Sequence, residues 1–234
     1  MTAAQPGGEA PARRGAAGYP PGRYLESDPD LLRDVIERYR FATVISARDV
    51  DDPVVTQLPL TLDAARGTHG MLFGHMDGAN PHADLLDGRP VLVLFHGPNG
   101  YISPHVYAST QLPTWNSITV HVRGTARVLR DSAAVARGLC GIAEASDRAP
   151  GAYRLSEKTA GDRRLLGLVV GFEIDIHEMT GRFKLSQDRD EQDRRLAALA
   201  LARGADPDDR PLIAAAVRLP LDPGDGPPRG PVRP

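Results

Sequence analysis

The chain has 234 residues, of which 41% are hydrophobic, so it is long enough for one barrel-sized domain with its own core. Its formal net charge of -2 argues against a dedicated nucleic-acid-binding domain, which carries a basic surplus. The single cysteine, Cys140, excludes an intrachain disulfide and a thiolate metal site within the chain. Without a secretory signal or an apolar run as long as a membrane span, we expect a cytoplasmic protein with no membrane contact.

Both ends of the chain are rich in Pro and Gly and have no hydrophobic period. Such segments bury too little apolar surface to offset the entropy lost on ordering. We therefore divide the chain into a disordered N-terminal segment over 1–18, one folded domain over 19–204, and a Pro/Gly-rich, largely disordered tail over 205–234.

The folded part begins with a helix and continues with strands. Capping side chains and a proline at Ser27 to Asp30 precede apolar residues at helical spacing, which end near Tyr39. Six β-branched or apolar runs, bounded by Gly, Pro, Asn and Asp, then predict strands over 41–47, 54–62, 71–76, 91–96, 118–129 and 168–176. Helices fit at 81–86, at 132–145, around Arg163 and at 191–202. Most connections are too short for intervening helices, so we predict a mainly β fold with flanking helices, built on an antiparallel barrel.

Several common chemistries lack their signatures in this chain. Neither G-x-G-x-x-G nor the P-loop pattern occurs, which disfavours the usual nucleotide-binding folds. The seven histidines include no H-E-x-x-H or H-x-H pair, so we expect no metal bound by the protein. No G-x-S-x-G elbow occurs, and Cys140 lies in a helix-like apolar stretch where a small buried side chain is the simplest interpretation.

Polar and glycine-rich segments near the strand ends carry the most information. In order they are G-H-x-x-x-A-N-P from Gly74, F-x-G-P-x-x-Y-I-S-P-x-x-Y from Phe95, P-T-W-N from Pro113 and F-K-L-S-Q-x-R from Phe183. Together they resemble the PaiB-type FMN-binding negative transcriptional regulators, over about Tyr19 to Leu201. The resemblance implies an antiparallel FMN-binding split β-barrel, related to pyridoxamine-phosphate oxidases, with FMN bound at a homodimer interface.

The resemblance also implies a set of cofactor-binding residues. They are Thr56 and Gln57 on the second strand, His75, Asn80 and Pro81 over the ribityl chain or phosphate, Pro113, Thr114, Trp115 and Asn116 as a wall near the flavin ring, and Lys184, Ser186 and Gln187 from a C-terminal segment of either subunit. Lys184, in a chain whose basic residues are nearly all arginine, is the expected phosphate or pyrimidine ligand. Structural alternatives stay open: Trp115 as a core aromatic, His75 as a structural histidine, Asn80 as a helix cap.

Two functions remain open from the sequence. One is a transcriptional regulator that senses flavin or redox state; direct DNA contact is not expected, because the chain has no helix-turn-helix pattern and no contiguous basic stripe. The other is an FMN-dependent oxidoreductase acting on a small molecule, with His75, Tyr101 and His105 as candidate proton-transfer groups. A heme-handling split barrel is a weaker third interpretation. The family's usual histidine and tryptophan are missing around Asn99-Gly100 and His105-Val106, and the 145–163 segment also departs from the family.

Overall fold

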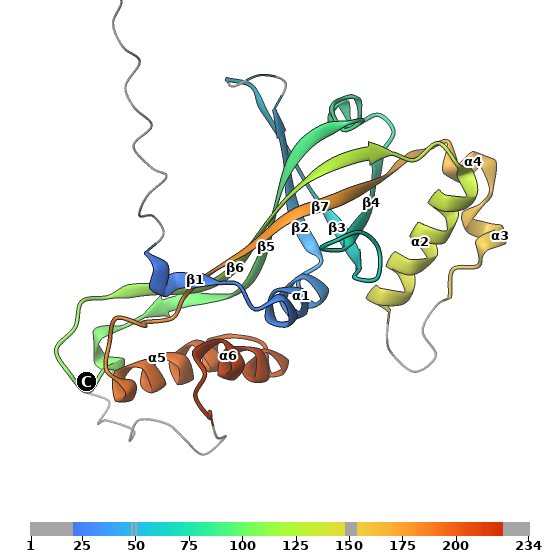
Figure 1. Ribbon diagram of the computed structural model, residues 1–234. Coiled ribbons are helices and arrows are strands. Elements are labelled where there is room, and N and C mark those ends of the chain that lie inside the picture. The colour runs from blue at the N-terminus through green and yellow to red at the C-terminus, as the bar shows by residue number, and fades with distance from the viewer. Residues whose placement is uncertain (1–20, 48, 50, 148–153, 222–234) are drawn as a thin grey trace, which may run out of the picture.

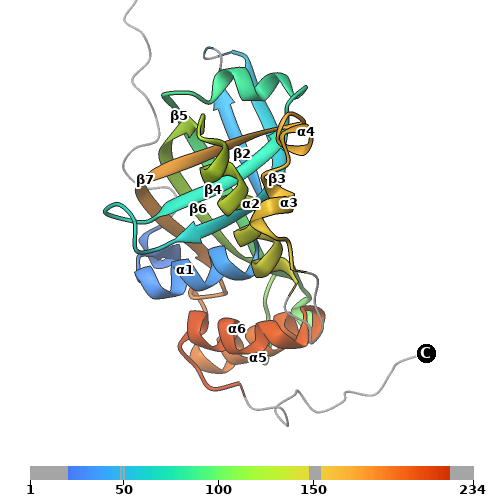
Figure 2. The same cartoon turned by 90° about the vertical axis from the view of Figure 1, so that its right-hand side faces the viewer.

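Antiparallel strands close into a barrel, and helices pack around it (Figures 1 and 2). The computed structural model describes residues 21–47, 49, 51–147 and 154–221. The strands are β1 (Leu25–Glu26), β2 (Phe41–Ala47), β3 (Pro53–Asp63), β4 (Met71–Asp77), β5 (Arg89–Ile102), β6 (Thr114–Val128) and β7 (Val169–Lys184). The α-helices are α1 (Pro29–Arg38), α2 (Ser132–Ser146), α3 (Glu157–Ala160), α4 (Arg163–Leu166), α5 (Glu191–Gly204) and α6 (Arg210–Val217). Short 3-10 helices are η1 (Gly22–Tyr24), η2 (Pro81–Leu85), η3 (Pro104–Val106) and η4 (Pro207–Asp209).

The strand order is β1-β7-β4-β3-β2-β5-β6, and a further pairing of β6 with β7 closes the sheet. The predicted antiparallel barrel with flanking helices is therefore confirmed. Strands β5, β6 and β7 run well beyond their predicted ends, so much of the segment around Trp115 and Lys184 is strand rather than loop. A register shift between His96 and Asn99 lets β5 continue through Gly97-Pro98, which composition alone marks as a break.

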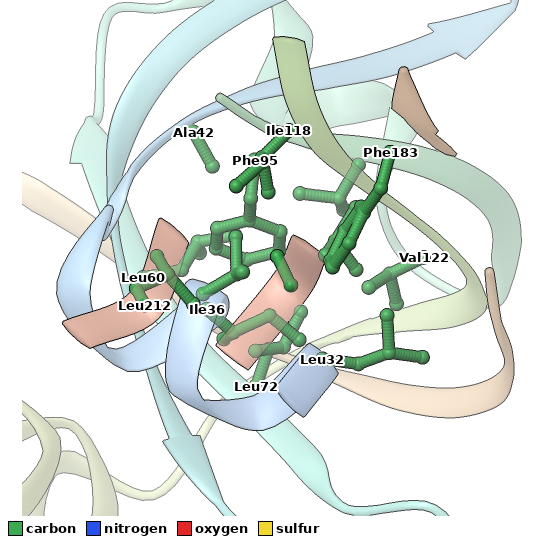
Figure 3. Packing of buried hydrophobic residues seen from close by; sticks show 14 of the residues in the cluster. Leu32, Ile36, Ala42, Leu60, Leu72, Phe95, Ile118, Val122, Phe183 and Leu212 are labelled. Atoms are coloured by element: carbon green, nitrogen blue, oxygen red, sulfur yellow. The ribbon is translucent and has the colours of Figure 1, made fainter. Parts of the chain in front are cut away.

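Alternate side chains of the strands point into the barrel and form its core. In β2, Ala42 and Val44 are buried while their neighbours are at least partly exposed, as expected for strands with one face in the core. Helix α1 closes one end of the barrel, because its Leu32 and Ile36 meet Phe95 and other barrel residues in one cluster (Figure 3). Asp28 caps this helix by accepting from the Asp30 amide, as the sequence predicted.

Helix α2 packs on the outside of the sheet, against β3, β4 and β7. The contact is close because α2 carries Gly138 where any Cβ would overlap the ring of Phe73 on β4. A second glycine of α2, Gly141, has open space at its Cβ position. The two glycines therefore serve different purposes on one helix: the first allows close approach, and the second only lowers helix propensity.

The C-terminal part of the chain is folded further than predicted. Helix α6 buries Leu212, Ile213 and Val217 in the main core, and Tyr39 donates to Asp209 just before it. The prediction of a largely disordered 205–234 tail was therefore wrong for residues 205–221; its short apolar run was hidden by surrounding Pro and Asp. Residues 222–234 and the predicted disordered segment 1–18 lie outside the described residues. Among the residues described, no helix is long and apolar enough to span a membrane.

We expect Gly138→Ala to destabilise the fold by about 1–3 kcal/mol, because the added methyl group forces α2 away from Phe73. Gly141→Ala is the matched control on the same helix and should stabilise by up to about 1 kcal/mol through helix propensity. Urea denaturation of both variants gives the two values. Equal effects at the two positions would contradict the proposed close contact.

Candidate functional site

Most of the residues predicted to bind cofactor lie in two hydrogen-bonded clusters or in a network beside one of them. The first, which we call the η2 cluster, consists of Thr56, Asn80 and His82. Asn80 caps η2 by accepting from the His82 amide at 3.0 Å, and its Nδ2 donates to Thr56 Oγ1 at 3.3 Å. The His82 Nδ1 lies 2.8 Å from the same hydroxyl. Pro81 is the first residue of η2, so the cap role proposed for Asn80 is confirmed.

His82 was missed by the sequence interpretation, although it follows directly after the A-N-P motif. It is wholly buried, and its Nε2 has no hydrogen-bond partner among the described residues. Burial lowers the pKa of His82, because the charged imidazolium loses hydration. Thr56 is therefore the shared polar contact that holds both the cap and a buried neutral histidine.

The second cluster, the hairpin cluster, consists of Tyr101, Trp115 and Lys184 with Asn99 and Thr114. Lys184 Nζ donates to Thr114 Oγ1 and, at 2.9 Å, to the Trp115 carbonyl. Trp115 Nε1 donates to Asn99 Oδ1 at 3.2 Å. Trp115 is 55% exposed and lies opposite Tyr101, which is 57% exposed. Trp115 is therefore not a core aromatic, and the two rings form an exposed aromatic surface.

A buried polar network supports this hairpin from beneath. Asn116 Nδ2 donates to Ser186 Oγ at 3.1 Å, and the Tyr107 hydroxyl lies 3.1 Å from the same atom. Ser186 has φ 61°, in the left-handed region that non-glycine residues rarely adopt. Gln187 accepts from the Leu185 amide at 2.6 Å and donates to the Phe183 carbonyl. Asn116, Ser186 and Gln187 thus use their polar groups to fix the corner that follows Lys184.

Asp193, the third residue of α5, holds the loop that leads into β6. The side chain is wholly buried and accepts from the Ala108 amide at 2.6 Å and from the Ser109 hydroxyl. Burial alone would raise the pKa of Asp193, but hydrogen bonds from Ser109 and Ala108 outweigh it and lower that pKa. The sequence predicted a helix over 191–202, but no local signal marks this long-range contact of Asp193.

The remaining candidates are placed elsewhere. His75 lies on the side of β4 that carries Phe73, toward α2, and burial lowers its pKa. Neither cluster includes His75. Gln57 is exposed on β3 opposite Thr43, and His105 is exposed on η3. Of the three proposed proton-transfer groups, only Tyr101 pairs with Trp115 across the β5–β6 hairpin.

The two clusters lie far apart on one chain. Cross-strand partners lead from Thr56 to Val44, then to Val93 on β5 and Val122 on β6. Trp115 is seven residues further along β6, about 23 Å at the usual rise of a strand. The η2 cluster and the hairpin cluster of the same chain therefore cannot line one small-molecule slot.

Strand pairing also assembles a feature that the linear sequence does not show. His96, Thr119 and Arg182 are direct neighbours across β5, β6 and β7. His121 and Arg123 follow on the same side of β6, and Lys184 follows on β7. We call the set His96, His121, Arg123, Arg182 and Lys184 the basic band. These residues are not contiguous in the sequence, and the strand register brings them to neighbouring positions on the folded surface.

The closed antiparallel barrel has the fold of a split barrel, and its outer face carries an exposed aromatic pair and a row of basic side chains. The chain belongs to the family described as "Putative FMN-binding domain", which matches residues 18–178. This membership agrees with the motif resemblance and assigns FMN as the cofactor. The segment that carries Lys184, Ser186 and Gln187 lies just beyond the matched residues.

Similar proteins support this placement. The chain is 29% identical over 179 residues to the "Protease synthase and sporulation protein PAI 2" of Bacillus subtilis, covering 75% of this chain and 84% of that protein. The fold is similar to the FAD and heme binding protein of Mycobacterium smegmatis, with a TM-score of 0.56, 19% identity and coverage of 73% and 78% of the two chains. It is also similar to the flavocytochrome Anf3 of Azotobacter vinelandii, with a TM-score of 0.54, 15% identity and coverage of 73% and 74%.

The donor set on the outer face fits a flavin mononucleotide. Trp115 and Tyr101 offer an aromatic surface for a planar ring, Gln57 offers an amide for its polar edge, and the basic band offers cations for a phosphate. These groups come from different strands of one face of the sheet. The chain therefore carries each kind of contact that this cofactor needs.

We expect Thr56→Val to destabilise the fold by about 1–3 kcal/mol. The substitution removes the hydroxyl group that both Asn80 Nδ2 and His82 Nδ1 contact, which leaves these polar atoms without that hydrogen bond. Thr56→Ser keeps the hydroxyl and should lose less. Urea denaturation measures both variants. If the serine variant is as unstable as the valine variant, the methyl group rather than the hydrogen bonds is responsible.

Stability should fall as the pH drops below about 6.5, the pKa of an unfolded histidine. Burial is the main cause of the lowered pKa values of His75, His82 and His121, so these residues take up protons on unfolding. Their contribution is complete above that pH and is lost as the pH falls toward the folded pKa values. Thermal denaturation between pH 7.5 and 5.5 should show a declining Tm, with a smaller decline in His82→Asn. The exposed control His69→Gln should keep the wild-type slope, and a flat wild-type profile would refute the prediction.

Proposed function

We propose that this chain is an FMN-binding, PaiB-like protein that works as a homodimer, with the hairpin cluster of one subunit completing the flavin site on the sheet face of the other. The observation that supports this arrangement most directly is the distance between Gln57 and Trp115 on one chain. The row of Gln57 meets β6 at His121, which is six residues, or about 20 Å, from Trp115 along the strand. Residues that match one family's cofactor motifs are expected at one site, and a second copy brings them together.

The exposed face has the character of an interface. Phe41 on β2 is 65% exposed and Val55 on β3 is 55% exposed, and both point outward with Gln57. In Figure 1 the labelled α-helices lie below and to the right of the strands. A two-fold pairing uses the same patch on both subunits and creates two equivalent sites.

Bound flavin supplies hydride and electron-transfer chemistry. The chain's own residues would bind and orient the flavin. The Trp115 and Tyr101 rings would cover one face of the flavin ring, and the Gln57 amide would donate to and accept from its polar edge. Lys184 holds the hairpin through Thr114 and the Trp115 carbonyl. A second subunit seated over this face would exclude water from the ring.

For the biological role, we propose a transcriptional regulator that senses flavin or redox state through a partner protein rather than by direct DNA contact. The motif resemblance to the PaiB-type negative transcriptional regulators supports a regulatory role, and the chain is also similar to the sporulation protein PAI 2. A homodimer would cover the basic band, which makes that surface unsuited to DNA. The alternative is an FMN-dependent oxidoreductase acting on a small molecule, which is favoured by Tyr101, a phenol placed beside Trp115.

Two assays on the purified, FMN-loaded protein separate these roles. Bleaching of the flavin bands by NADH or NADPH, with turnover of a small-molecule acceptor, would support the oxidoreductase. A regulator should show no turnover, and its capture of a transcription component should depend on the flavin's redox state. A salt-controlled gel shift with specific DNA would overturn the proposal that contact is indirect.

The composite site predicts complementation between subunits. Trp115→Ala removes the aromatic ring of the hairpin cluster, and the double variant Thr43→Ala/Gln57→Ala removes polar groups from the outer face of β2 and β3. Each variant alone should therefore lose most FMN binding. Random pairing of the two variants should restore about one quarter of the sites, because half of the dimers then carry one undamaged site. Flavin fluorescence quenching on the co-expressed mixture measures this fraction. No recovery, with dimers formed, would place each site within one chain.

A further inference from the structure

The basic band crosses β5, β6 and β7 on the outer face of the barrel. His96 and Arg182 flank Thr119 in one row across three strands. His121 lies one row further along the same side of β6, opposite Thr180. The register thus brings two imidazoles and a guanidinium onto neighbouring positions of one surface, with hydroxyl groups between them.

The side chains of this set are close enough to interact. The pKa of His121 is lowered first by burial and then by the positive charges of Arg123 and Arg182 and by His96. The Thr43 hydroxyl lies 3.5 Å from His96 Nε2, and the Thr119 hydroxyl donates to the Arg182 carbonyl at 3.2 Å. An acidic neighbour, Glu178, faces Arg123 at 3.9 Å, at the end of the band away from His96.

We propose that His96, His121 and Arg182 form the binding site for the phosphomonoester dianion of FMN. This inference rests on the proposed function and refines it, because it assigns the phosphate to the basic band. A guanidinium and two imidazole N–H groups are suitable donors to a phosphate. Lys184, the expected phosphate ligand, has another role, since its Nζ contacts Thr114 and the Trp115 carbonyl and thereby fixes the aromatic hairpin.

The dimer gives an energetic reason for this assignment. When a second subunit covers the face, the Arg182 guanidinium and the two imidazoles lose contact with water, and polar groups that leave water need hydrogen bonds in its place. A phosphate dianion in the row of His96, Thr119 and Arg182 would accept such hydrogen bonds. The band should therefore contribute to FMN binding and contribute nothing to binding of riboflavin, which has the same ring without the phosphate.

The test compares FMN and riboflavin affinities, measured by flavin fluorescence quenching, for the full chain and its variants. Wild type should bind FMN more tightly than riboflavin. His96→Gln/His121→Gln and, separately, Arg182→Gln should each weaken FMN binding about ten- to a hundredfold, the usual size of lost charged hydrogen bonds. Riboflavin affinity should stay at the wild-type value, which also shows that the variants are folded. His69→Gln and Arg130→Gln, both on exposed positions away from the face, should bind both flavins as wild type does.

A competition experiment adds a second readout. Inorganic phosphate should weaken FMN binding by wild type and leave riboflavin binding unchanged, whereas it should have no effect on the Arg182→Gln variant. Equal wild-type affinity for the two flavins, or equal losses for both in the variants, would overturn the phosphate site and leave the flavin site intact. A wild-type chain that binds neither flavin would overturn the proposed function itself. A DNA gel shift lost in the same variants, with FMN affinity unchanged, would assign the band to nucleic acid instead.

Discussion

Strands β6 and β7 pair from Ser117 opposite Lys184 to Val128 opposite Phe172, and this pairing closes the barrel. Because side chains alternate across a strand, the same register decides which residues fill the core and which face outward. Ile118, Val120 and Val122 are buried on β6, so the residues between them face outward by necessity. A shift of one residue would bury His121 and expose the core. Packing of the hydrophobic core therefore determines where the residues of the basic band lie, and no ligand is needed to position them.

The same strands carry the aromatic hairpin away from the core, and this arrangement needs support. A two-stranded extension is marginal alone. Here α5 packs against β5, Asp193 anchors the loop before β6, and Ser186 is held in an unfavourable backbone conformation by Asn116 and Tyr107. Polar residues that look like ligands in the sequence are thus partly structural. Their contribution to a site is indirect, since they determine where Trp115 and Lys184 lie.

Local patterns were sufficient to predict most elements of this fold. The cap and proline at the start of α1, and the β-branched runs of the strands, reflect preferences of a few neighbouring residues. The end of β5 was predicted too early, because Gly97-Pro98 indicates a break unless a bulge and a partner strand compensate. Helix α6 was missed, since its short apolar run is stabilised by burial against the core rather than by propensity.

The candidate site was predicted as a set of residues but not as an arrangement. Motif order identified Trp115 and Asn80, whereas the distance between them follows from the strand register, which no local pattern encodes. Likewise, His96, His121 and Arg182 are separated by tens of residues in the chain and become neighbours only through pairing. The distance between Gln57 and Trp115 on one chain, and the position of the three residues on the outer face, support the proposal that two subunits together complete a flavin site. In that arrangement each cofactor would contact both subunits, so dimer formation and FMN binding would be thermodynamically coupled.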